Sequence, residues 1–325
     1  MRRLVDDPRL MWKCCSLYYQ DGLGQQEVAQ ALGISRPTVS RMLKNGRDSG
    51  MVRIEVASPA GTLYGEMERA LEKQFGLQEV IIVQPTVTEE GTEKIVSPLG
   101  AAVFQYLLRI LRAGDYVGVT MGMTLQNVVR SESVIEDPLD VTFVPVLGGV
   151  SETRYDVHSN TIAAGFAERF HATCVQFFSP AVFSSGEILE AFKTEKEVEK
   201  IYRLFSCLDA IVMGIGILEE HLSTIRKLGY IDTHTLERFK ANGAEGDIAL
   251  QYFDNKGNTK AFSEHNSCVA GIRIETIHNI RYRIGVTSGQ EKAKAVLAAI
   301  NGDFINVLIT DVNCAGEILR LSETE

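Results

Sequence analysis

A run of basic and hydroxyl side chains near the N-terminus has the composition of a surface that binds DNA. Its members are Arg36, Thr38, Ser40, Arg41 and Lys44. At helical spacing they lie opposite Val39, Met42 and Leu43, which form an apolar face. Hydroxyl groups and arginine can reach base edges in the major groove, and basic groups bind phosphates. This pattern predicts a recognition helix.

A helix-turn-helix would present that face to DNA, and residues 25–43 have its features. Val28 and Ala29 fall on one side of a first helix, and Gly33 can take the left-handed conformation that ends it. Ser35 is a good N-cap for the second helix. The alternative is a helical hairpin whose polar face is merely solvated, but the spacing favours DNA binding.

Two flanking segments complete a predicted DNA-binding domain of residues 1–57. Residues 8–20 are expected to form a supporting helix, and Met51–Ala57 a β-rich wing, with a plain linker strand as the alternative. Arg53 in that strand could contact the DNA backbone. The predicted DNA-binding residues are Gln25, Ser35, Arg36, Thr38, Ser40, Arg41, Lys44 and Arg53.

The charge of the chain is unevenly distributed. The whole sequence of 325 residues has a net charge of −9, yet residues 1–57 contain nine Lys and Arg against six Asp and Glu. Residues 58–325 contain 24 against 36. Local phosphate neutralisation contributes much of DNA affinity, so an acidic second domain is compatible with a DNA-binding head. The length also favours two domains, with the second spanning residues 58–325.

Several classes of protein are disfavoured by what the sequence lacks. The N-terminal residues have no apolar core of a signal peptide, and no apolar run is long enough for a membrane span. The six cysteines form no CxxC pair, and the six histidines show no metal-ligand spacing. Adjacent Cys14 and Cys15 point apart on a helix, which disfavours a redox switch. We expect a cytoplasmic protein without metal or cofactor.

After the breaker residues Ser58–Gly61, a helix over Leu63–Phe75 is expected to connect the domains or to pack against a second subunit. β-rich runs then alternate with helical stretches. The expected strands are 79–84, 115–120, 141–147, 173–178, 209–214, 248–253, 282–287 and 305–310. The expected helices are 98–112, 158–170, 195–206, 290–301 and 311–321. This alternation predicts an α/β domain with a parallel sheet covered on both faces.

Glycines and small polar residues follow five of the expected strands. They are Met121–Thr124, Gly148–Gly149, Gly214–Gly216, Ser288–Gly289 and Thr310–Asp311. Ligands of such sheets bind beyond the carboxyl ends of the strands, where glycine lets main-chain N–H groups approach an anion. Tight turns need glycine for their own reasons, but several such loops together favour a phosphorylated small molecule.

The segment YYQDGLGQQEVAQALGISRPTVSRMLKNGRDSGMVRIEV resembles the winged head of the SorC/DeoR-type sugar-responsive transcriptional regulators. The resemblance continues through GVTMGMTLQNV, PVLGG, GAEGDI, GVTSGQEKAKAVLAAI and NVLITD, and so covers nearly the whole chain. It implies a winged helix-turn-helix domain followed by a Rossmann-like domain similar to sugar-phosphate isomerases. It also implies a homo-oligomer, a dimer or tetramer, whose binding to the operator of a carbohydrate-utilisation operon responds to a sugar or sugar phosphate.

The resemblance also implies site residues. Gly118, Gly122 and Thr124 match a phosphate or hydroxyl cradle, and Leu147 precedes the glycines of an LGG segment. A hydroxyl-binding polar position, a GD segment and a GxxKA segment are matched further on. The implied effector-binding residues are Gly122, Thr124, Gly148, Gly149, Asn160, Asp247 and Lys292. This chain has Met121 and Met123 where the family often has tryptophan and arginine, which widens the possible effectors.

Each implied residue also has a structural interpretation. Asn160 and Asp311 could cap helices, Asp247 could cap a helix or form a turn, and Lys292 could be a solvated helix residue. A fused sugar-phosphate isomerase or lyase is the alternative function, with Asp247 and Lys292 as base and acid. No acid–histidine pair accompanies them in a recognisable spacing, so we predict a sensor and not an enzyme.

Overall fold

The computed structural model describes residues 7–54, 63–84, 86–87, 93–94, 96–131, 135, 137–149, 155–219 and 229–323. The chain divides into two compact units, Met1–Leu63 and Tyr64–Glu325. The boundary predicted after Ala57 falls among residues 55–62, outside the described residues. Each unit is described by itself below.

The N-terminal unit is a helical domain made of α1 (Pro8–Tyr19), α2 (Gln25–Leu32) and α3 (Arg36–Asp48). Gly33 ends α2 with φ of 67°, and the Ser35 side chain caps α3 by accepting a hydrogen bond from the Thr38 N–H. Both features agree with the sequence analysis. The core contains Cys14, Cys15, Val28, Ala29, Val39, Met42 and Leu43.

Gly46 has a packing role that the sequence did not reveal. A Cβ atom at this position would lie 2.5 Å from Sγ of Cys15, so glycine allows α1 to lie close against α3. The predicted wing is corrected in part. Met51–Ile54 form bends and coil and no strand, and Glu55–Ala57 lie outside the described residues.

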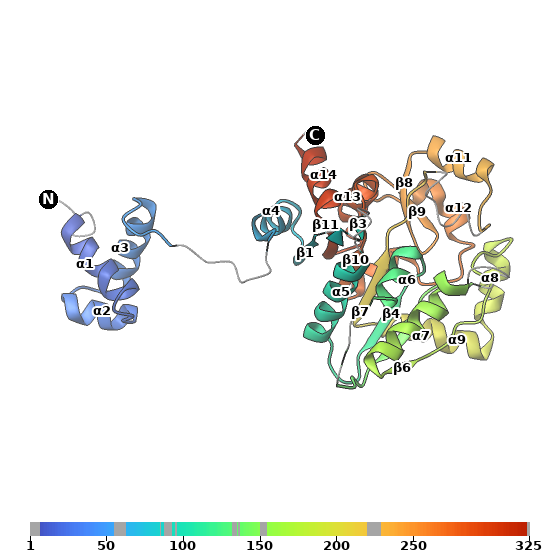
Figure 1. The fold of residues 1–325 in the computed structure, drawn as a ribbon, viewed down its shortest axis with the longest axis horizontal. Helices are drawn as coiled ribbons and strands as arrows, with labels where there is room; N and C mark the ends of the chain where they lie inside the picture. Colours follow the sequence, from blue (N-terminus) through green and yellow to red (C-terminus); the bar gives the residue numbers. More distant parts are fainter. Residues whose placement is uncertain are drawn as a thin grey trace. The chain divides into compact units, whose positions relative to one another are not determined.

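The second unit is built on a parallel sheet of seven strands in the order β1-β11-β10-β7-β4-β5-β6 (Figure 1). These strands are β1 (Glu79–Val83), β4 (Tyr116–Val119), β5 (Thr142–Pro145), β6 (Thr173–Cys174), β7 (Ala210–Gly214), β10 (Tyr282–Val286) and β11 (Val307–Asp311). The described helices are α4 (Gly65–Phe75), α5 (Val96–Ile110), α6 (Met123–Val129), α7 (Ser159–Phe170), α8 (Gly186–Lys193), α9 (Lys196–Phe205), α11 (Thr233–Ala241), α12 (Ser263–Asn266), α13 (Ala293–Asn301) and α14 (Val312–Ser322). Short 3-10 turns are η2 (Tyr155–Val157), η3 (Lys260–Phe262), η4 (Ile274–Asn279) and η5 (Gln290–Lys292).

Both faces of the sheet are buried, as expected for parallel strands. Along β7, Ala210 and Val212 belong to the core under α5, α6 and α7, whereas Ile211 and Met213 belong to the core that includes residues of α4, α13 and α14. Among the described residues, no helix combines the length and apolar character needed to cross a bilayer.

The strand predicted over residues 248–253 is corrected in part. Residues 248–253 contain the end of β8 (Ala244–Ile248), a turn at Ala249 and Leu250, and most of β9 (Gln251–Asp254). The two strands form an antiparallel hairpin that is separate from the main sheet. The turn residues Ala249 and Leu250 both have positive φ, 50° and 63°, without the glycine or asparagine that would mark such a turn in sequence. Another two-stranded pair is β2 (Thr86–Val87) with β3 (Glu93–Lys94).

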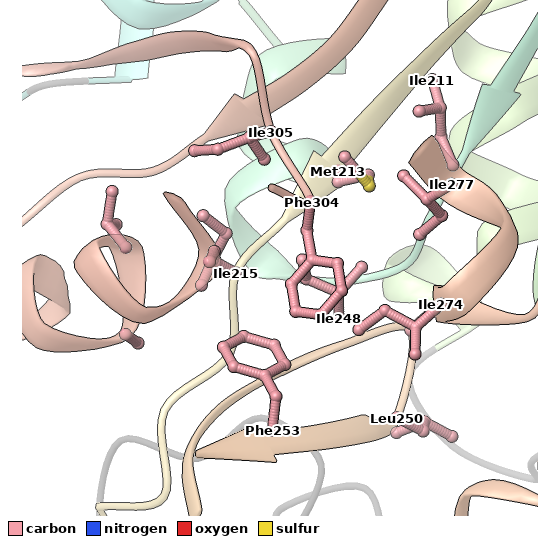
Figure 2. Close-up of a cluster of buried hydrophobic side chains, with 14 of the residues drawn as sticks. Ile211, Met213, Ile215, Ile248, Leu250, Phe253, Ile274, Ile277, Phe304 and Ile305 are labelled. Atoms are coloured by element: carbon pink, nitrogen blue, oxygen red, sulfur yellow. The ribbon is translucent and has the colours of Figure 1, made fainter. Parts of the chain in front are cut away.

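Apolar packing anchors this hairpin beside the end of β7. Figure 2 shows side chains of the hairpin in one buried cluster with Ile215 and with residues of η4. The cluster includes Ile211, Met213, Ile215, Ile248, Leu250, Phe253, Ile274, Ile277, Phe304 and Ile305. Packing therefore fixes the hairpin at the carboxyl ends of the strands, where the predicted effector residues lie.

Candidate recognition helix and effector site

The exposed face of α3 is the one predicted to read DNA. Arg36, Ser40, Arg41 and Lys44 are exposed, while Val39, Met42 and Leu43 are buried against α1 and α2. Gln25 is partly exposed at the start of α2, and Arg53 is exposed beyond α3.

The two hydroxyl residues at the start of α3 are engaged with each other. Oγ of Ser35 lies 2.8 Å from Oγ1 of Thr38 and 3.4 Å from the Thr38 main-chain nitrogen. This contact gives Ser35 a capping function in the free protein. Thr38 remains partly exposed.

The sheet has a change of direction between β4 and β7, which are neighbours. From β4 the chain proceeds to β5 and β6 on one side, and it then returns to β7 on the other side of β4. Loops that leave adjacent strands in opposite directions form a crevice at their carboxyl ends, where ligands of such sheets bind. The segments that begin this crevice are Met121–Gly122 after β4 and Ile215–Gly216 after β7.

Asp247 is a buried carboxylate beside the segment that follows β7. Its main chain pairs with that of Gly216 in both directions, with N···O distances of 2.9 and 3.3 Å. Its Oδ2 accepts a hydrogen bond from the Leu250 N–H at 3.3 Å, whereas its Oδ1 has no hydrogen-bond partner within the described residues. Burial raises the pKa of Asp247 to about 7, and the charge of Lys292 and the Leu250 N–H oppose this rise.

Gly216 makes room for that carboxylate. A Cβ atom on Gly216 would lie 1.9 Å from Oδ1 of Asp247. Gly216 is one of the glycines that follow the predicted strands, and the structure gives it the specific function of admitting the Asp247 side chain.

Lys292 is held at the same point of the sheet. Its Nζ donates a hydrogen bond to the main-chain oxygen of Ile215 at 2.8 Å. Burial lowers the pKa of Lys292, and the negative charge of Asp247 opposes this effect. Lys292 thus contacts Ile215, and Asp247 pairs with the next residue, Gly216. The tertiary structure brings Asp247 and Lys292 to the same segment after β7, although 44 residues lie between them in sequence.

Asp311 fixes the loop that precedes Lys292. Its Oδ2 accepts a hydrogen bond from the Gly289 N–H at 2.6 Å, and its Oδ1 accepts from the Asn313 and Cys314 N–H groups. The two hydrogen bonds to Oδ1 confirm that Asp311 caps α14, as predicted. The hydrogen bond from Gly289 to Oδ2 positions the loop and was not evident from the sequence.

Two other predicted loops are connected by the end of η2 and the start of α7. The Gly122 N–H donates to the Val157 oxygen at 3.0 Å, and the Ser159 hydroxyl donates to the Leu147 oxygen. Gly122 has φ of 130° and begins α6, with Thr124 half-buried in its first turn.

The loop of Gly148 and Gly149 is closely packed. The Gly148 N–H donates to the Ala270 oxygen at 2.8 Å. A Cβ atom on Gly149 would lie 2.7 Å from Nδ1 of His158 and 3.0 Å from the Tyr230 hydroxyl, which are 2.9 Å apart. His158 and Tyr230 therefore border this loop. No sequence motif marks either residue.

Asn160 does not cap α7, and its amide hydrogen-bonds to the segment after β6. Its Nδ2 donates to the Phe177 oxygen at 3.0 Å, and its Oδ1 accepts from the Phe177 N–H at 2.8 Å. The N-cap position of α7 is His158. Both polar atoms of Asn160 are thus engaged with one main-chain residue, which makes it a residue that fixes the segment after β6.

Within the described ranges, no cluster of three or more His, Cys, Asp or Glu side chains could hold a metal ion. Asp247 and Lys292 are titratable groups held beside Ile215 and Gly216 after β7. Their opposite charges suit an uncharged polyol at the first and an anion at the second.

Two protein families and several relatives match this chain. The family described as "Putative sugar-binding domain" matches residues 62–320, and the homeodomain-like domain family matches residues 13–51. The deoxyribonucleoside regulator of Bacillus subtilis (strain 168) is 29% identical over 313 residues, which cover 96% of this chain and 97% of the relative. The sorbitol operon regulator of Klebsiella pneumoniae is 29% identical over 323 residues, covering 97% and 99%.

A solved structure agrees over the same length. The full-length sorbitol operon regulator SorC from Klebsiella pneumoniae superposes with a TM-score of 0.70 at 27% identity and covers 97% of this chain and 99% of its own. The family match, the helix-turn-helix and the parallel sheet lead to one conclusion. The chain belongs to the SorC family of DNA-binding transcriptional regulators with a sugar-binding domain.

Proposed function

We propose that this regulator senses a sugar or sugar phosphate at the crevice beside β7, with Asp247 and Lys292 as the principal contacts. The observation that carries the proposal is Oδ1 of Asp247, a buried acceptor without a partner among the described residues. Buried polar atoms in native proteins are nearly always hydrogen-bonded, so an unsatisfied carboxylate oxygen indicates a missing donor. A sugar hydroxyl is a donor of that kind.

The second contact determines where an anionic group would bind. Met121 and Met123 leave the loop after β4 without a cation, whereas Lys292 is placed after β10. A phosphate on the effector would therefore pair with Lys292, and the main-chain N–H groups of the strand-end loops would add donors. A neutral polyol would use Asp247 alone.

The exposed face of α3 would bind operator DNA, with Arg36 and Arg41 as the strongest candidates for base contacts. Helix-turn-helix proteins read two half-sites as dimers, which supports a homo-oligomer. Effector binding would alter operator affinity by linkage, in a cytoplasmic protein that controls a carbohydrate operon. Its relatives are named as regulators, which supports a sensor that does not turn its ligand over.

A thermal-shift screen tests the proposal, because a ligand that binds only the folded state raises the melting temperature. The probes are sorbitol 6-phosphate and 2-deoxyribose 5-phosphate with their unphosphorylated parents. We expect a shift that disappears in Asp247→Asn, and a preference for the phosphate that disappears in Lys292→Met. The same ligand should change binding to a DNA duplex selected from a random pool, and it should be recovered unchanged. A response that is equal in wild type and Asp247→Asn would refute this site.

A further inference from the structure

The outer edge of the parallel sheet is closed by carboxylates. β1 is the end strand, and it pairs with β11 on one side only. On its other side, the Val80 N–H donates to Oε1 of Glu72 at 3.0 Å, and the Ile82 N–H donates to Oε1 of Glu68 at 2.9 Å. Two side chains one helical turn apart on α4 thus replace a neighbouring strand.

Apolar contacts accompany these hydrogen bonds. Leu71, which lies between the two glutamates in sequence, is fully buried, and Val80 and Ile82 are 2% and 7% exposed. Buried main-chain N–H groups need a hydrogen-bond acceptor, and for Val80 and Ile82 both acceptors come from α4. Removal of α4 would leave a bare strand edge, which proteins normally protect. The attachment of α4 therefore depends on Glu68 and Glu72 as well as on Leu71.

The position of α4 in the chain gives this attachment a consequence. α4 is the first described helix after residues 55–62, which join it in sequence to the DNA-binding head. Leu71 of its apolar face is buried in its own domain, with Met67 and Phe75 packed beside it, whereas Leu63 is exposed. Any change in the attachment of α4 changes the point from which the head is tethered.

The strand that pairs with β1, β11, leads to the candidate effector site. β11 pairs with β1 over its whole length and ends at Asp311, whose carboxylate holds the Gly289 N–H in the loop before Lys292. α14 begins after Asp311 and contacts both α4 and η5. Asp311 thus connects the Lys292 loop to β11, which pairs with β1, and to α14, which contacts α4.

We propose that Glu68 and Glu72 form a latch that couples effector occupancy to the DNA-binding head. This inference rests on the proposed function. In one state both carboxylates accept hydrogen bonds from main-chain N–H groups of β1. In the other state these hydrogen bonds are broken, and α4 is released or shifted along the strand. An effector changes the balance because it binds one arrangement of the Gly289–Lys292 loop better than the other. Glu68 and Glu72 are positioning residues that touch neither ligand.

The test measures two quantities in each variant: the affinity for the effector probe, and the change in operator affinity that the probe causes. In Glu68→Met/Glu72→Met, both acceptors are lost while helix propensity and side-chain length are nearly kept. The probe is whichever of sorbitol 6-phosphate and 2-deoxyribose 5-phosphate gives the larger thermal shift with the wild type. We expect this variant to bind that probe within threefold of the wild-type affinity. Its operator affinity should change less than twofold when the probe is added, whereas that of the wild type changes at least fivefold.

Two further variants separate the latch from a general structural effect. Glu68→Gln/Glu72→Gln keeps a carbonyl acceptor at each position and should restore most of the coupling. Glu66→Met on the exposed face of α4 should behave as the wild type. Amide hydrogen exchange supplies a direct readout, since Val80 and Ile82 should exchange at least tenfold faster in the double Met variant.

The outcomes distinguish the two proposals. A double Met variant with wild-type coupling, or with unchanged exchange at Val80 and Ile82, would overturn the latch while the effector site stands. A loss of probe binding in that variant would show that Glu68 and Glu72 only stabilise the domain, which also overturns the latch. A wild-type protein whose operator affinity ignores every effective probe would refute the proposed function, and the latch would fall with it.

Discussion

Oδ1 of Asp247 occupies the space that a Cβ atom of residue 216 would need, 1.9 Å from its ideal position. The carboxylate and the glycine come from β8 and from the loop after β7, and their main chains are paired. This relationship makes the carboxylate geometry dependent on a residue with no functional group.

Gly216→Ala should therefore damage effector binding without affecting the head. The new methyl group must displace the Asp247 carboxylate, and we expect at least a tenfold loss of effector affinity, about 1.4 kcal/mol. Gly214→Ala is the matched control, because its Cβ would meet the Met121 oxygen at an ordinary contact of 3.4 Å. Calorimetric titration of both variants checks this. Equal affinity in Gly216→Ala and wild type would show that Asp247 does not bind the effector.

The raised pKa of Asp247 predicts a specific pH dependence of stability. Its folded-state pKa of about 7 lies above the unfolded value, so the folded state retains its proton more strongly. This contribution to stability is full below about pH 4 and is lost as pH rises to about 7, by a few kcal/mol at most. Urea unfolding of wild type and Asp247→Asn from pH 5 to 8 measures the difference. A constant difference across that range would contradict the shift.

Effector affinity should change with pH in the opposite direction. Ionised Asp247 accepts hydroxyl donors more strongly than the protonated acid, so affinity should increase as pH rises through about 7. The titration is best made with an unphosphorylated sugar or polyol, because phosphate itself titrates near pH 6. Asp247→Asn should give a flat profile. A wild-type profile without change between pH 6 and 8 would count against Asp247 as the acceptor.

Arg41→Ala should separate DNA binding from effector binding. Arg41 is exposed on α3 and plays no part in its cap, so its removal should cost about 1–3 kcal/mol of operator affinity. The effector-induced thermal shift should remain that of the wild type. Arg9→Ala on α1 is a control that removes the same charge from another exposed helix of the head. Similar losses in both variants would indicate general attraction to DNA and no recognition by α3.

Gly46→Ala should weaken the head through its core. The added Cβ would lie 2.5 Å from Sγ of Cys15, and overpacking of this kind costs about 1–3 kcal/mol. Operator affinity should fall while effector affinity stays constant. The double variant Gly46→Ala/Cys15→Ala removes the sulfur and should recover part of the loss. If Cys15→Ala does not relieve Gly46→Ala, the close approach of α1 to α3 is not the cause.

The helix-turn-helix could be predicted from sequence because its signals are local. Gly33 ends one helix, Ser35 caps the next, and the apolar residues of α3 recur at helical spacing, all within a few residues of one another. The strand-end glycines were found for the same reason. Resemblance to a family then supplied Asp247 and Lys292, which no local pattern marks as a pair.

Only the tertiary structure showed how distant segments meet. Pairing of Asp247 with Gly216, contact of Gly46 with Cys15 and capping of β1 by Glu68 and Glu72 all depend on packing between elements that are separate in sequence. The β8–β9 hairpin was missed because Ala249 and Leu250 adopt positive φ under the constraint of a buried cluster, against their own preference. Local sequence thus determined most elements and their caps, because those signals lie within a few neighbouring residues, whereas the register and packing of the folded domain decided which side chains meet at the candidate site.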